Sequence, residues 1–347
     1  MTTSSGAAER TDWAELFFDA WYDELAAGEA VGRDDPATWR REELRAECER
    51  GSSEEVVHWL LALDGTEPVG SAELRMTLRD NTQVAHLTLA VGPRHRRRGV
   101  ATLLLERALD VAEAAGRTRL RVEVDRPVGT DPGRWPGVCV ARRWALTAGQ
   151  EVARRQLVLP VAADHLDRLE AAVGAHADGY SVSAFAGAIP EADLDGVARL
   201  VARMSTDAPS GDLEVEPEVW DGERVREGEA LRAVQGRRQW LALARADDGA
   251  LVGYTMLLHS EHEPGRLLQW DTLVLREHRG HRLGLLLKLA CLRAAVADVP
   301  QAQRVTTWNA ISNIPMITVN EALGFTWDET TQELEQEITL VRAALRH

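Results

Sequence analysis

The stretch Arg96-Arg97-Arg98-Gly99-Val100-Ala101 has a counterpart 183 residues later, Arg279-Gly280-His281-Arg282-Leu283-Gly284. Each copy follows an apolar segment typical of a strand, residues 84–91 or 267–275, and precedes an apolar helical segment. The first amides of a helix lack intrahelical partners and carry partial positive charge, so a turn rich in Gly and Arg at this place suits a pyrophosphate. The sequence therefore predicts a phosphate-binding turn that occurs twice.

A solvated basic loop is the alternative explanation for residues 94–98, and the flanking strand and helix argue against it. The first copy fits the pattern [Arg/Gln]-x-x-Gly-x-[Gly/Ala] and resembles motif A of the GCN5-related N-acetyltransferases, which holds the pyrophosphate of coenzyme A. The second copy has Arg282 where the middle Gly is expected. We expect Arg282 to keep a helical conformation and still to donate its amide. The resemblance implies that coenzyme A contacts Arg96, Arg97, Arg98, Gly99, Val100, Ala101, Arg279, Gly280, His281, Arg282, Leu283 and Gly284.

Hairpins repeat at the same spacing as the turns. Residues 59–70 and residues 240–253 each predict two strands around an Asp-Gly turn, and Gly70 and Gly253 are again 183 residues apart. A chain of 347 residues suggests two domains at about 150 residues per domain. The resemblance implies an α/β (α+β) protein with two tandem acyl-CoA N-acyltransferase domains, each a mixed twisted sheet flanked by helices. We expect domains at 11–160 and 179–347, with a linker at 161–178.

Both halves show one order of elements: a helix, a hairpin, a third strand, the basic turn, a long helix, a strand, a helix and a last strand. The second half also has a leading strand at 180–186, for which the first half shows no clear equivalent. The expected last strands are residues 151–159 for the first half and residues 334–341 for the second.

A second motif lies downstream in the C-terminal half only. Residues 309–325 resemble motif B of the same family, which implies that Asn313 contacts the pantetheine arm and that Phe325 belongs to the cofactor site. The alternative is a helix capped by Asn313 and ended by Gly324, which needs no ligand. The family often has a Tyr that protonates the thiolate where this chain has Asn320. A side-chain amide is not acidic enough to protonate the thiolate. We therefore expect that Asn320 only hydrogen-bonds the sulfur, or that water and another residue supply the proton.

In the first half the matching motif places Val138, Ala145 and Gly149 at the positions of Asn313, Asn320 and Gly324, so the motif has decayed. We therefore expect catalysis in the C-terminal half. The N-terminal half then either binds coenzyme A without turnover or braces the fold.

The catalytic groups are expected on residues 267–275. By resemblance, the oxyanion would be stabilised by the main-chain amide of Leu273, Val274 or Leu275. Asp271 lies two residues before Leu273 and thus on the same face of the strand, where it is our candidate for the general base. A structural ion pair with a nearby Arg is the alternative for this carboxylate.

The charge balance limits the acceptor. A formal net charge of −15 argues against nucleic acid and favours a cationic partner, a small-molecule or peptide amine. In the fold that the resemblance implies, the segment after the first helix of the second half walls the acceptor site, so Asp207, Asp212 and Glu216 are candidate substrate ligands, although a solvated acidic loop explains them as well.

No metal site is expected, because the three scattered cysteines lack metal-binding spacing. The sequence has neither a secretory signal nor an apolar run of about 20 residues, so we expect a cytoplasmic protein without membrane contact, as a monomer or homodimer.

The sequence thus predicts transfer of an acetyl or other short acyl group from acyl-CoA to a primary amine by direct attack in a ternary complex. The rival hypothesis is a non-catalytic acyl-CoA-binding or regulatory protein. A dinucleotide-binding fold is excluded, since neither turn has the G-x-G-x-x-G pattern and each follows a late strand of its half.

Overall fold

The computed structural model describes residues 2–3, 7–174 and 176–346; residues 1 and 4–6 of the polar N-terminal stretch lie outside it. The chain divides into two compact units. Unit 1 consists of Met1–Glu151, Gly211–Glu214 and Glu329–His347, and unit 2 of Val152–Ser210 and Val215–Asp328.

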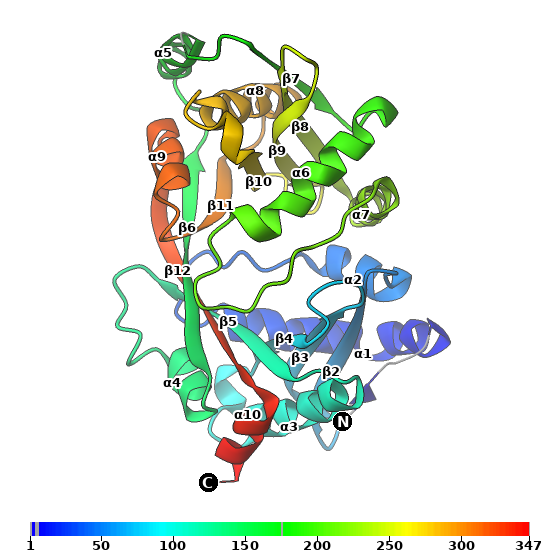
Figure 1. Ribbon diagram of the computed structural model, residues 1–347. Coiled ribbons are helices and arrows are strands. Elements are labelled where there is room, and N and C mark those ends of the chain that lie inside the picture. Colours follow the sequence, from blue (N-terminus) through cyan, green and yellow to red (C-terminus); the bar gives the residue numbers. More distant parts are fainter. Residues whose placement is uncertain (1, 4–6, 175, 347) are drawn as a thin grey trace. The chain divides into compact units, whose positions relative to one another are not determined.

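Unit 1 is a mixed sheet between two layers of helices (Figure 1). The apolar side chains of α1 and α2 pack on one face around Trp21 and Trp59, while α3 and α10 pack on the other around Leu104. The sheet order is β1 (Thr2–Thr3), β2 (Glu55–Asp64), β3 (Glu67–Thr77), β4 (Val84–Ala90), β5 (Arg119–Pro127) and β12 (Thr326–Glu337). The helices are α1 (Ala7–Glu29), α2 (Arg41–Arg50), α3 (Val100–Ala114), α4 (Pro136–Arg143) and α10 (Ile338–Leu345).

Unit 2 repeats this plan. Trp240 and Leu287 belong to the core between the sheet and α8, whereas α6 and α7 cover the opposite face (Figure 1). The sheet order is β6 (Thr147–Val158), β11 (Arg304–Ala310), β10 (Arg266–Val274), β9 (Leu251–Ser260), β8 (Arg237–Ala246) and β7 (Tyr180–Ala186). The helices are α5 (Ala163–Gly174), α6 (Leu194–Asp207), α7 (Gly222–Val234), α8 (Leu283–Asp298) and α9 (Ile314–Leu323).

The two units exchange their last strands, which the sequence did not indicate. In unit 2, residues 152–158 of β6 pair antiparallel with β11, and in unit 1, residues 329–337 of β12 pair antiparallel with β5. The expected last strand at 334–341 ends instead at Glu337, where α10 begins. Leu334 of β12, with Ile338 and Val341 of α10, is buried in the core under α3, so the C-terminal segment completes unit 1. At the other end, the two-residue β1 pairs with β2 and supplies a leading strand that the sequence did not reveal.

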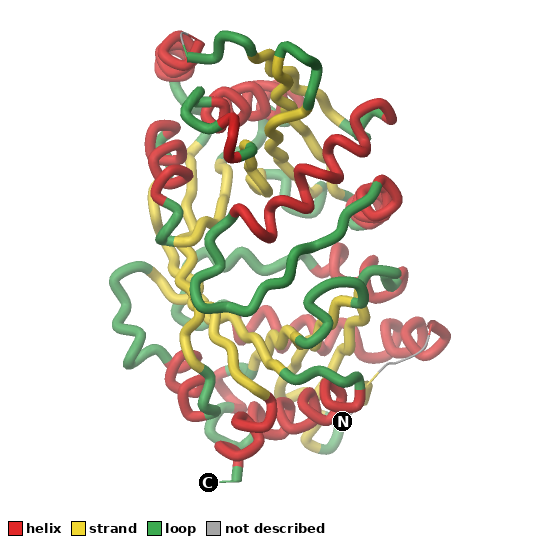
Figure 2. Tube along the Cα trace, viewed as in Figure 1, coloured by secondary structure: helices red, strands yellow, loops and turns green. Residues whose placement is uncertain are grey.

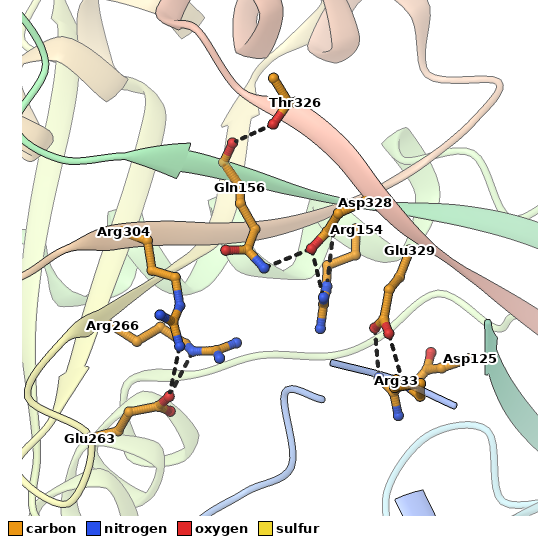
Figure 3. A network of polar contacts seen from close by, with 10 residues as sticks. All are labelled: Arg33, Asp125, Arg154, Gln156, Glu263, Arg266, Arg304, Thr326, Asp328 and Glu329. Carbon is orange, nitrogen blue, oxygen red and sulfur yellow. Dashed lines mark hydrogen bonds and ion pairs between the residues drawn. The ribbon is translucent and has the colours of Figure 1, made fainter. Parts of the chain in front are cut away.

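Figure 3 shows how neighbouring residues of β12 pair within different units. In unit 1, Arg33 donates to both carboxylate oxygens of Glu329, at 2.8 and 2.7 Å, and forms an ion pair with Asp125 at 3.0 Å. In unit 2, Arg154 donates to both oxygens of Asp328, at 3.1 and 2.6 Å, and Gln156 donates to the same carboxylate. Elsewhere in unit 2, Glu263 pairs with Arg266 and Arg304.

Replacing Arg33 with Met should destabilise unit 1 by about 3–5 kcal/mol, because the buried carboxylate of Glu329 is left without its cation. Urea unfolding of the wild type and of Arg33→Met measures the difference in the free energy of unfolding. In Arg33→Met/Glu329→Leu the loss should be much smaller than in Arg33→Met alone, because the nearly buried carboxylate of Glu329 is gone and Asp125, the other partner of Arg33, is partly exposed to solvent. A single-variant loss below about 1 kcal/mol would contradict this account, since that is the range of exposed pairs.

Candidate acyl-CoA site

The two basic turns share one backbone conformation. In unit 1, Arg97 and Gly99 have φ of 62° and 84°, and their counterparts in unit 2, Gly280 and Arg282, have φ of 92° and 55°. Each turn therefore has two left-handed positions, and in each turn one is Gly and the other is Arg. A non-glycine residue there costs roughly 1–2 kcal/mol. We expected Arg282 to keep a helical conformation. Its backbone lies instead in the left-handed region, at the N-cap of α8, so the expectation was wrong.

The turn of unit 2 presents main-chain amides and open space. Among the described residues, the amides of 280–284 have no hydrogen-bond acceptor; the first amides of α8 that find one are Leu285 and Leu286, both on Arg282 O. A Cβ placed on Gly284 would meet no atom within 4 Å. Free amides at a helix N-terminus with room in front of them suit a pyrophosphate. This turn thus fits the phosphates of coenzyme A.

The first arginine of each turn has a structural role. Arg96 Nε donates to Val91 O at 2.9 Å, and Arg279 Nε donates to Val274 O at 3.0 Å. These bonds hold each turn onto the end of the preceding strand and occupy the Nε of the arginine. The remaining polar side chains of the two turns are exposed or half-buried: Arg97, Arg98, His281 and Arg282.

The sheet of unit 2 opens next to the turn. Parallel pairing of β10 with β11 ends at Gln269 and Thr307, although β10 continues to Val274 and β11 to Ala310. We call the space between these unpaired ends the fork. In unit 1, pairing of β4 with β5 likewise ends before either strand does. A fork leaves unpaired main-chain groups that an extended ligand arm can use.

The direction of the amides on β10 separates the three candidates for oxyanion stabilisation. The amide of Leu275 donates to Val252 O of β9 at 2.9 Å. Because successive amides of a strand point to opposite edges, the amide of Leu273 also faces β9, and only that of Val274 faces the fork. Leu273 and Leu283, two of the residues expected to contact coenzyme A, are buried; Leu283 lies at the start of α8.

Asp271 is held by a tyrosine and not by an arginine. A bulge interrupts β10 between Gln269 and Thr272, and Asp271 lies in it. Its carboxylate accepts a hydrogen bond of 2.9 Å from Tyr254 on β9, and no Arg or Lys of the described chain pairs with it. Burial raises the pKa of Asp271 above its usual range, and the charge of Glu218 adds to this rise, while Tyr254 and Arg232 oppose it. A carboxylate with a raised pKa is suited to accept a proton near neutral pH.

Unit 1 has lost this pair. Tyr254 is matched by Ser71 and Asp271 by Thr88, each 183 residues earlier, and the pairing of β3 with β4 shows no bulge. Neither Ser nor Thr can act as a general base at neutral pH without activation. Of the two forks, only that of unit 2 therefore has a carboxylate in this position.

The three acidic residues expected at the acceptor site have different surroundings. They lie on or next to the loop between α6 and α7, residues 208–221 (Figure 2). The side chain of Asp207 is 2% exposed and pairs with Arg279 and Arg203, so its carboxylate is not open to an acceptor. Asp212 belongs to unit 1, where its amide donates to Gly149 O, and Glu216 is exposed in unit 2.

Glu218, which sequence reasoning missed, is the loop carboxylate whose charge raises the pKa of Asp271.

The motif B residues have structural roles as well. Asn313 caps α9, with its Oδ1 accepting from Met316 N at 3.3 Å, which leaves its Nδ2 to donate to a ligand. Asn320 is fully buried and bonded to Lys288, so its side chain cannot reach a thiolate directly. Phe325 is buried in the core with its ring 5.6 Å from Lys288 Nζ, so it supports the site without lining it.

The matching helix of unit 1 ends earlier than the sequence comparison indicated. The left-handed C-terminal residue is Ala145, with φ of 63°, in the place of Gly324 with φ of 102°. Leu146 N donates to Ala141 O just as Phe325 N donates to Asn320 O. Ala141 is therefore the counterpart of Asn320, and Gly149 lies beyond the motif.

The family follows from a comparison with known proteins. Residues 12–129 and 208–325, more than half of the chain, match the acetyltransferase (GNAT) family. The chain belongs to the acetyltransferase (GNAT) family. Each match contains one basic turn, and the expected tandem GNAT fold is confirmed. GNAT proteins bind acyl-CoA, in agreement with the amides and open space of the unit 2 turn.

Solved structures resemble the whole chain. A tandem GNAT protein from the clavulanic acid biosynthesis pathway is 26% identical, with a TM-score of 0.74 and coverage of 97% of this chain and 98% of that one. A GCN5-related N-acetyltransferase from Sphaerobacter thermophilus is 14% identical, with a TM-score of 0.62 and coverage of 97% of this chain and 95% of that one. At this identity the similarity extends to the fold only. A search of curated proteins found no match. No helix among the described residues of this GNAT protein is long and apolar enough to cross a membrane.

Proposed function

We propose that this GNAT protein transfers an acetyl or other short acyl group from acyl-CoA to a primary amine, and that the reaction occurs in unit 2. The observation that carries the proposal is the carboxylate of Asp271, held by Tyr254 at the fork of unit 2 and replaced by Thr88 in unit 1. The negative net charge agrees with an amine acceptor.

Each step is assigned to a group of unit 2. The amides of 280–284 bind the pyrophosphate of acyl-CoA, and Asn313 Nδ2 donates to the pantetheine arm. Acyl-CoA, once bound, would supply the thioester carbonyl that the amine attacks directly. The C–N bond forms as the C–S bond breaks, and coenzyme A leaves as a thiolate that takes up the second proton of the amine nitrogen. Asp271 accepts the proton of the acceptor ammonium, and the amide of Val274 donates to the oxygen on which negative charge develops. Positioning of both reactants supplies much of the remaining acceleration.

Asp271→Asn should lower kcat by about 100-fold or more with little change in the Kd of acetyl-CoA, because the variant loses the base and keeps the turn. In the wild type, kcat should fall as pH drops through the raised pKa of Asp271, because the protonated acid accepts no proton. Tyr254→Phe should move this fall to higher pH, since the hydrogen bond that favours the carboxylate is gone.

The test is steady-state transfer from acetyl-CoA across a panel of primary amines, with calorimetric binding alongside. Thr88→Asn is the matched control in unit 1 and should keep wild-type turnover. Equal kcat in the wild type and Asp271→Asn would remove Asp271 as the base. Acetyl-CoA binding without turnover on any amine would instead support a non-catalytic acyl-CoA-binding protein.

A further inference from the structure

Unit 2 buries a lysine where unit 1 buries a leucine. Lys288 lies on α8, nine residues after Arg279, and is 2% exposed. Leu105 takes the same place on α3, nine residues after Arg96, and packs in the core of unit 1. A buried amine costs stability unless it is compensated, and an apolar residue evidently serves the fold at this position. Folding alone therefore does not account for Lys288.

The hydrogen-bond partner of Lys288 is also specific to unit 2. Lys288 Nζ donates to Asn320 Oδ1 at 2.7 Å, and Asn320 is fully buried on α9. The counterpart of Asn320 in unit 1 is Ala141, which packs in the same core as Leu105. Both members of the polar pair are thus apolar in the unit that lacks the Asp271 carboxylate.

The lysine fixes the direction of a chain of amides. Lys288 donates, so the carbonyl of Asn320 must face it and the Nδ2 of Asn320 must face away. This Nδ2 donates to Asn309 Oδ1 on β11. The carbonyl of Asn309 is then occupied, while its own Nδ2 has no acceptor among the described residues. Burial lowers the pKa of Lys288 to about 7, and since the charged and neutral amines both carry N–H donors, the direction is the same in each.

The last amide of the chain belongs to the fork. Asn309 lies two residues beyond Thr307, the last residue of β11 that pairs with β10, and it is half-buried. Asn309 therefore lies in the part of β11 that no longer pairs with β10, on the opposite side of the fork from the end of β10 at Val274. Carbonyl oxygens recur along the arm of acyl-CoA and are the acceptors that such a donor fits.

We propose that Lys288 is a positioning residue which, through Asn320, holds the side-chain amide of Asn309 as a hydrogen-bond donor to a carbonyl oxygen of the acyl-CoA arm in the fork. The inference rests on the proposed function, in that it requires unit 2 to bind acyl-CoA. Lys288 and Asn320 would thus have a role in cofactor binding and turnover that their apolar counterparts in unit 1, Leu105 and Ala141, lack.

The test is a double-mutant cycle in the full-length chain with Lys288→Met and Asn309→Leu. Calorimetry gives the Kd of acetyl-CoA, and steady-state kinetics gives kcat and KM. Asn309→Leu should weaken acetyl-CoA binding about 5- to 10-fold, as expected for one lost hydrogen bond. Lys288→Met should weaken it by a similar or smaller factor, and the double variant no more than Asn309→Leu alone, because both changes remove one contact.

Leu105→Met is the matched control in unit 1 and should leave the Kd unchanged. If the factors of the two single variants multiply in the double variant, the positioning role is wrong while the proposed function stands. If Lys288→Met lowers only the thermal midpoint and leaves Kd and kcat at wild-type values, Lys288 is structural and the inference fails. Absence of acetyl-CoA binding by the wild type overturns the proposed function and this inference together.

Discussion

Gly284→Glu is expected to weaken acetyl-CoA binding by unit 2 at least about 100-fold, which corresponds to about 2.7 kcal/mol. The new side chain enters the open space in front of the free amides of 280–284, where the phosphates are expected. Its negative charge takes the place of the ligand's charge at the helix N-terminus. The helix itself should tolerate the change, because a carboxylate in the first turn is favourable there.

The matched variant in unit 1 is Ala101→Glu, at the position equivalent to Gly284. Calorimetric titration with acetyl-CoA should show the site of unit 2 intact in Ala101→Glu and lost in Gly284→Glu, with thermal midpoints near the wild type for both. An unchanged titration of Gly284→Glu would show that the phosphates bind elsewhere. That outcome would overturn the assignment of the turn.

Ending the chain at Asp328 is expected to unfold unit 1. The deletion removes residues 329–337 of β12 from their pairing with β5 and takes Leu334, Ile338 and Val341 out of the core. Burial of each such side chain is worth about 1.5–3 kcal/mol, so the three together approach the whole stability of a typical domain. The cost comes on top of the lost ion pairs of Glu329 and Glu335.

Hydrogen exchange measures this effect by region. Amides of β2 to β5 should lose protection in the chain that ends at Asp328. A chain shortened only by Arg346 and His347 is the control and should keep full protection. Retained protection of these strands in the chain that ends at Asp328 would show that unit 1 folds without β12, against the strand exchange described above.

The repeated turn was within reach of sequence reasoning, because a strand, a basic turn and a helix are local features that leave a pattern. Its conformation was harder to foresee. Gly99 and Gly280 mark different left-handed positions, and only the structure shows that Arg282 and Arg97 take the other two. The strand exchange was out of reach, since the alternation of residues along β6 or β12 does not say which sheet a strand joins.

The candidate site was predicted in part. Asp271 is the candidate base because a carboxylate interrupts an apolar strand, but its partner Tyr254 is 17 residues away and the bulge that presents it leaves no clear sequence signal. Lys288 interrupts the apolar run at 283–292 in the same way, and a charge within such a run was a signal that could have been used. The ion pairs of Asp207 could not be foreseen, because a loop of like charges does not reveal which members pair with arginines.

The central claim is that acyl transfer occurs in unit 2, and turnover of the two turn variants tests it most directly. Transfer from acetyl-CoA to an amine that the wild type accepts should continue near the wild-type rate in Ala101→Glu and fall at least about 100-fold in Gly284→Glu at subsaturating acetyl-CoA. Loss of transfer in Ala101→Glu with full activity in Gly284→Glu would place the reaction in unit 1 and contradict the account.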